Sequence, residues 1–301
     1  MSVDDFYRWF EEHEADDFPE LELPVVAGGD ALVPVEAEIP PSIRWETGDD
    51  VSHIVRATTL EAALMMHDYL DSLGATDMVT PVNLYVYTYG DDLLNVIARE
   101  EGLGSEAAAE YFHEGHPVTG GVGWMIMNAS HPWFSEATQI ARMTFVAKEL
   151  FHRYQITMGR AHAADPFWLY VGSARYLANR IVPEDWILNS VMDPIVRISS
   201  YDDFRPVRVE SAKRVDEELG GMDTWENWHA VPLEEANSYS ILAAELLAAH
   251  AGEASLVRYY VLLGSNPNWR DAFEEAFGIS VDEFYELFNE HRAAGFPVQV
   301  Q

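Results

Sequence analysis

Apolar residues recur at helical spacing in the middle of the chain, and this pattern constrains the fold more than any other. The positions are Met143, Val146, Ala147, Leu150 and Tyr154. Because an α-helix completes a turn every 3.6 residues, this spacing places all five side chains on one face. The sequence therefore predicts a long helix here whose apolar face packs against a core.

The ends of this helix and of its successor carry their own signals. Ser135, followed by Glu136, is expected to cap the first helix, since a serine hydroxyl accepts a free backbone N–H and an acid suits the first turn. Asp165-Pro166 interrupts the chain. A second helix is predicted over 167–181.

Upstream, strand and helix patterns are mixed. Strands are predicted over 82–89, where apolar and polar residues alternate, and over 120–128, which is apolar at its centre. Helices are predicted over 54–72, 91–101, 105–113, 236–251 and 254–263, with two more flanking Gly278 in the tail. Residues 183–235 are expected to be irregular. The fold class is therefore expected to be α+β, a small mixed-sheet lobe followed by a helical lobe.

A length of 301 residues suits about two lobes. We expect a short helix and an extended arm over 1–45, an α/β lobe over 46–134 and a helical lobe over 135–301. The longest apolar runs, 121–127 and 259–263, are far shorter than the about 20 residues that cross a bilayer. The N-terminus lacks a basic-then-apolar leader. The location is expected to be cytoplasmic if Met1 is the native start, and outside the cell if a signal peptide has been removed.

Charge narrows the range of partners. The chain has 18 basic and 51 acidic residues, a net charge of −33, so neither nucleic acid nor an anionic membrane is expected to bind it. Only Lys148 and Lys213 are lysines. Salt adaptation and a GC-rich genome both explain an acidic, lysine-poor composition. The absence of cysteine excludes disulfides, thiolate catalysis and iron–sulfur ligation.

Residues 148–152 carry a pattern close to a catalytic zinc motif. Zinc peptidases place two histidines four residues apart on one helix face, with a glutamate directly after the first as general base. Here Glu149 and His152 occupy two of these places, and Lys148 stands where the first histidine would be.

The segment from Trp168 to Tyr176 strengthens this interpretation. It resembles the second helix of the gluzincin metallopeptidases, W-L-x-E-G-x-A-x-Y, in five positions: Trp168, Leu169, Gly172, Ala174 and Tyr176. The tail over 269–284 also resembles that family's closing pattern. The chain over about 50–290 is thus similar to the thermolysin-like, peptidase-MA group, and this resemblance implies a two-lobe zincin fold.

The resemblance also assigns positions. Val171 stands at the third zinc-ligand position, Tyr239 at that of a transition-state-stabilising tyrosine, and strand 121–128 where the family has a substrate-facing edge strand. Trp124, Trp168 and Gln155 are expected to line the cleft. Lysine repels Zn²⁺ and valine has no donor atom, so His152 is left as the single ligand of a site that needs three.

These residues predict a pseudopeptidase that binds a peptide, a protein or a small molecule in the former active-site cleft, without a cofactor. The alternative is an enzyme with altered chemistry. It would use ligands rebuilt from His113, Glu114, His116 or His162 to hold zinc, or acid/base or lysine catalysis through Lys148 and Glu149. Lys148 is interpreted as a cation replacing a cation, and the competing interpretation is a lysine nucleophile.

Overall fold

The computed structural model describes residues 39–137, 139–181, 186–188, 196–198, 201–214, 233–266 and 268–298. The short helix and most of the arm predicted over 1–45 lie outside the described residues.

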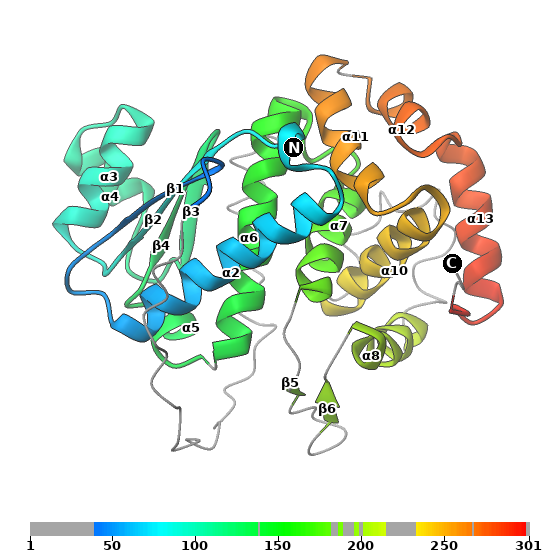
Figure 1. The fold of residues 1–301 in the computed structure, drawn as a ribbon, viewed down its shortest axis with the longest axis horizontal. Helices are drawn as coiled ribbons and strands as arrows, with labels where there is room; N and C mark the ends of the chain where they lie inside the picture. Colours follow the sequence, from blue (N-terminus) through cyan, green and yellow to red (C-terminus); the bar gives the residue numbers. More distant parts are fainter. Residues whose placement is uncertain are drawn as a thin grey trace.

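The first half of the fold is built around a four-stranded mixed sheet (Figure 1). It contains β1 (Ile43–Thr47), β2 (Val82–Tyr87), β3 (Val118–Gly121) and β4 (Trp124–Asn128), in the order β1-β2-β4-β3. The first three strands in this order are parallel, and β3 pairs antiparallel with β4. β2 and β4 are therefore interior strands, and β3 is an edge.

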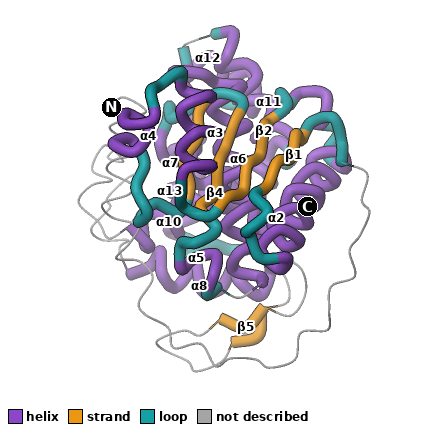
Figure 2. The backbone as a smooth tube through the Cα atoms, turned by 90° about the vertical axis from the view of Figure 1, so that its left-hand side faces the viewer, coloured by secondary structure: helices purple, strands orange, loops and turns teal. Residues whose placement is uncertain are grey.

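Helices cover both faces of the sheet (Figures 1 and 2). On one face, α3 (Asp91–Glu101) and α4 (Ser105–Tyr111) pack with Tyr85, Trp124 and Ile126. On the other, α2 (His53–Ser72) and α6 (Gln139–Gly159) cover the side chains that alternate with these. A parallel strand buried on both sides is apolar throughout, which explains the continuous apolar run in β4.

The second half is helical. Its α-helices are α5 (Pro132–Ser135), α7 (Phe167–Arg180), α8 (Tyr201–Arg214), α10 (Leu233–Ala251), α11 (Ala254–Ser265), α12 (Trp269–Phe277) and α13 (Val281–Ala293). Short elements are the 3-10 turns Thr76–Met78 and Arg160–His162 and the strand pair β5 (Trp186–Leu188) and β6 (Val196–Ile198). α7 packs between α6 and α10. One apolar cluster runs from Ile43 to Phe296 through the sheet and these helices, and the division into lobes stays a prediction.

Close approach of two backbones requires glycine at Gly172 and at Gly120, among other positions. A Cβ on Gly172 of α7 would lie 2.1 Å from the carbonyl oxygen of Ser240 in α10. A Cβ on Gly120 of β3 would lie 2.5 Å from the carbonyl oxygen of Trp124. Gly172, one of the residues of the gluzincin-like segment, therefore has a packing role, because it lets α7 and α10 approach each other.

Most predicted elements are confirmed, and three details are wrong. The predicted strand 120–128 is a hairpin, because Gly123 adopts φ +80° and reverses the chain between β3 and β4. Ser135 ends α5 rather than capping the long helix, and its hydroxyl donates to the His131 carbonyl. The stretch 183–235, expected to be irregular, contains α8.

No single helix within the described residues is long and apolar enough to span a membrane. The pair 236–251 and 254–265, bent by 97° at its break, passes that test only when its two halves are taken together.

Candidate functional site

The residues of the zinc-like pattern project from α6 toward neighbouring elements, and all three are buried. Lys148, Glu149 and His152 are 6%, 3% and 5% exposed. α6 and α7 pack side by side, as the sequence predicts. The apolar stripe of α6 is buried too, so these polar groups lie at the margin of a packed core.

Three charges meet on one face of α6. Lys148 Nζ lies 3.1 Å from Glu149 Oε1 and 4.9 Å from the centre of the Phe145 ring. Arg153 Nη2 lies 3.9 Å from Glu149 Oε2. Burial would raise the pKa of Glu149, but the positive charges of Lys148 and Arg153 outweigh it and the pKa is lowered. Glu149 is therefore an ionised carboxylate engaged by cations.

Arg153 also links α6 to the edge of the sheet. Its Nη1 donates to the carbonyl oxygen of Gly120 in β3, over 2.9 Å, and the side chain is fully buried. The backbone N–H of Gly123, in the hairpin turn, donates to Thr157 Oγ1 of α6 over 2.9 Å. These bonds fix β3 beside Glu149. Arg153 was not among the predicted site residues, although an arginine four residues after a glutamate on one helix face is a signal for such a pair.

The hydrogen bonds around His152 define its tautomer. Gln155 Nε2 donates to the Tyr170 carbonyl over 3.0 Å and to Ser173 Oγ over 2.8 Å, so its Oε1 faces His152 Nδ1, 2.8 Å away. An amide oxygen only accepts, so Nδ1 carries the proton and Nε2 keeps its lone pair. The Tyr170 ring lies 4.3 Å from the imidazole, centre to centre. Burial lowers the pKa of His152 to about 3, and the ring is neutral at pH 7.

Gln155 is therefore a buried partner of His152, and its role in lining a cleft stays a prediction. Val171 is buried in a small apolar cluster with Ile156, Ala163 and Tyr170. Its convergence with positions 148 and 152 remains a prediction.

Three other predicted site residues lie in packed regions. Tyr239 is buried on α10 against Phe288 and Phe296 of the C-terminal segment. Trp124 lies in the core between the sheet and helices α3 and α4. Trp168 stacks on Phe284 at 5.3 Å. Aromatic side chains carry much apolar area and commonly pack into cores. The roles of these three residues in a site or cleft stay predictions.

Of the histidines proposed as rebuilt ligands, two lie side by side and the third pairs with an aspartate. The rings of His113 and His116 lie 3.5 Å apart, and His162 pairs with Asp165 at 3.6 Å on the surface. Among the described residues, no group of three or more histidine, aspartate or glutamate side chains is arranged to hold a metal ion.

No family model, curated protein or solved structure matches the chain. The likeness to gluzincins accordingly stands on the residues of the two helices and the tail.

Proposed function

We propose that this chain is a non-catalytic protein of thermolysin-like, gluzincin architecture. Its cleft takes a peptide, protein or small-molecule ligand, and a lysine ammonium stands in the place of the metal ion. The observation that carries the proposal is the buried pair of Lys148 and Glu149, 3.1 Å apart. A cation in the metal position preserves the charge that the neighbouring carboxylate needs, because a buried carboxylate without a counter-charge is strongly unfavourable.

The state of Glu149 supports a non-catalytic role. A general base works best with a pKa near the working pH. Its lowered pKa and its two cationic neighbours make Glu149 a weak base. The neutral His152, with its lone pair on Nε2, has the form that a metal ligand takes, but catalytic zinc needs three protein ligands.

Repair of the two missing ligands tests the proposal. The double variant Lys148→His with Val171→Glu should bind one zinc ion through the introduced imidazole, the introduced carboxylate and the existing His152, while each single variant binds it much more weakly. Lys213→His with Val261→Glu is the matched control, since it introduces the same two side chains at exposed positions. Calorimetric zinc titration is the measurement, with circular dichroism to check the fold.

Two results would overturn the proposal. A folded double variant that binds no more zinc than the control would show that the two helices are not aligned with a gluzincin site. Stoichiometric zinc in the purified natural protein, lost in His152→Ala, would favour the alternative of a metal-dependent hydrolase.

A further inference from the structure

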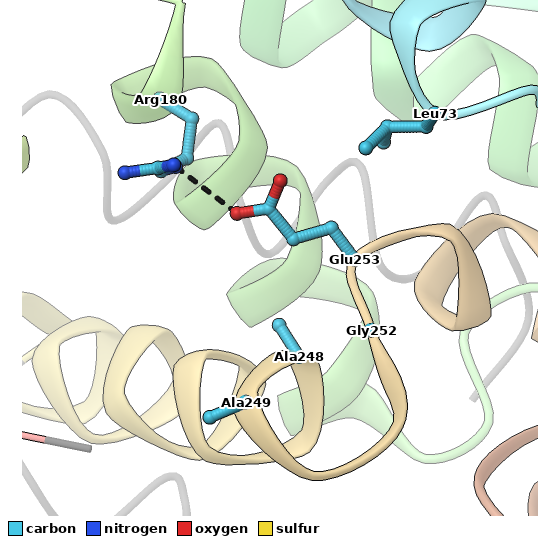
Figure 3. Close-up of a pocket in the computed structure, with 6 residues that line it drawn as sticks. All are labelled: Leu73, Arg180, Ala248, Ala249, Gly252 and Glu253. Carbon is cyan, nitrogen blue, oxygen red and sulfur yellow. Dashed lines mark ion pairs between the residues drawn. The ribbon is translucent and has the colours of Figure 1, made fainter. Parts of the chain in front are cut away.

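A pocket lies at the C-terminal end of α7, where Arg180 is the last residue of the helix. It has a volume of about 530 Å³ and is lined by Leu73, Arg180, Ala248, Ala249, Gly252 and Glu253 (Figure 3). The ends of α2, α7 and α10 and the turn into α11 form its walls. This volume lies within the range of sites for small molecules, ~300–1,000 Å³.

A single carboxylate organises the polar side of the pocket. Glu253 Oε1 accepts from Arg180 Nε over 3.0 Å and from the Tyr176 hydroxyl over 2.7 Å, and Oε2 accepts from the Tyr69 hydroxyl. Gly252, at φ +87°, makes the sharp turn that brings Glu253 to this place. Since a carboxylate offers about four acceptor positions, Glu253 can accept one more donor.

The pair is accessible from the pocket. The Arg180 side chain is 39% exposed and that of Glu253 is 13% exposed. Figure 3 shows the guanidinium and the carboxylate side by side, with Ala248, Ala249 and Leu73 around them. Small aliphatic side chains leave room for an apolar group, and the wall therefore combines one cation, one anion and an apolar floor.

We infer that this pocket binds a small zwitterion, a free α-amino acid with an apolar side chain. Its carboxylate would approach Arg180, its ammonium group would donate to Glu253, and its side chain would contact Leu73 and Ala249. A guanidinium matches a carboxylate in shape and charge. Both charges of the ligand meet an opposite charge, so no net charge is buried.

Charge argues against the simpler ligands. A net charge of −33 on the chain repels an anion, and Glu253 beside Arg180 adds to that repulsion. The same net charge attracts a simple cation, which Arg180 beside Glu253 opposes locally. A zwitterion has no net charge and gains from both groups.

Binding is tested on the full chain by calorimetry with L-leucine and two analogues that each lack one charge, 4-methylpentanoate and isoamylamine. We expect saturable binding of leucine, and binding at least about tenfold weaker for each analogue, since each analogue loses one hydrogen-bonded charge pair. Absence of leucine binding, or equal binding of either analogue, would overturn the inference.

Variants locate the site. Arg180→Gln and Glu253→Gln should each weaken leucine binding at least about tenfold, because each removes one charge. Ala249→Leu should do the same by filling the pocket while leaving the ion pair in place. Ala107→Leu, at an exposed position of α4, is the matched control and should bind as the natural chain does. Unchanged leucine binding in the correctly folded Ala249→Leu variant would place any site elsewhere.

Discussion

The approach of α7 to α10 at Gly172 can be tested by one methyl group. In Gly172→Ala the new Cβ would lie 2.1 Å from the carbonyl oxygen of Ser240 and 2.5 Å from its carbonyl carbon, where ordinary contact begins at 3.4 Å. The obstacle is backbone of the facing helix, so the two helices must separate by on the order of 1 Å.

The magnitude follows from two opposing effects. Overpacking of a core costs about 1–3 kcal/mol, and a backbone obstacle places this variant at the upper end. The higher helix propensity of alanine than of glycine inside a helix stabilises the folded state by about 1 kcal/mol. The free energy of unfolding should therefore fall by about 2 kcal/mol, which is about a 30-fold change in the ratio of folded to unfolded chains.

Urea unfolding followed by circular dichroism measures this difference. Gly104→Ala is the control, since Gly104 has φ −78° and no atom within 4 Å of the added Cβ. It should lose no more than about 1 kcal/mol, because its added methyl group meets no atom and the loss comes only from alanine being a poorer N-cap than glycine. If Gly172→Ala unfolds at the same urea concentration as the natural chain, the close packing of α7 on α10 is refuted.

Charge and pH give three further predictions. Glu149→Gln leaves Lys148 and Arg153 beside a neutral amide and should lower the free energy of unfolding by about 3 kcal/mol. Folding lowers the pKa of Glu149, so the difference in free energy of unfolding between the natural chain and the variant should be complete above the unfolded pKa of ~4.3 and should narrow as the pH falls below about 4. Urea titrations at several pH values measure this difference. A difference that stays constant with pH would show that the charge of Glu149 is unimportant. His152, with a pKa of about 3, should stay neutral in NMR titrations from pH 8 to 4. The unfolded chain takes up that proton near pH 6.5. Below that pH, His152 should therefore lower the free energy of unfolding by up to about 1.4 kcal/mol per pH unit, and His152→Gln should remove this contribution. Titration of the His152 imidazole near pH 6 would contradict its burial. The melting temperature should rise with KCl up to molar concentrations if the charge of −33 reflects salt adaptation, because salt screens repulsion beyond ~10 Å at 0.1 M; a flat or falling curve would favour the genome explanation.

Periodicity located the long elements of this fold well. The helix predicted over 91–101 matches α3, and that over 54–72 misses the start of α2 by one residue. The apolar stripe of α6, from Met143 to Tyr154, is buried as predicted. Such patterns succeed because helix and strand impose a fixed spacing on the side chains that face a core.

The site was predicted only in part. The face of α6 that carries Lys148, Glu149 and His152 follows from local sequence, because residues three and four apart share a helix face. The bond from Arg153 to Gly120 joins residues 33 positions apart, and local spacing contains no information about such a pair. Tyr239 was assigned by resemblance, and its burial against Phe288 and Phe296 depends on how the C-terminal segment packs.

By itself, the sequence determined the class of fold, the helices with a continuous apolar face, the exclusion of cysteine chemistry and the excess of negative charge. Only the tertiary structure decided that β4 is an interior strand, that Glu149 is held between two cations, and that Glu253 gathers donors from α2 and α7. The physical reason is that secondary structure follows from interactions a few residues apart. Burial, pKa and pocket chemistry depend on neighbours that are distant in the chain and meet only when the core is packed.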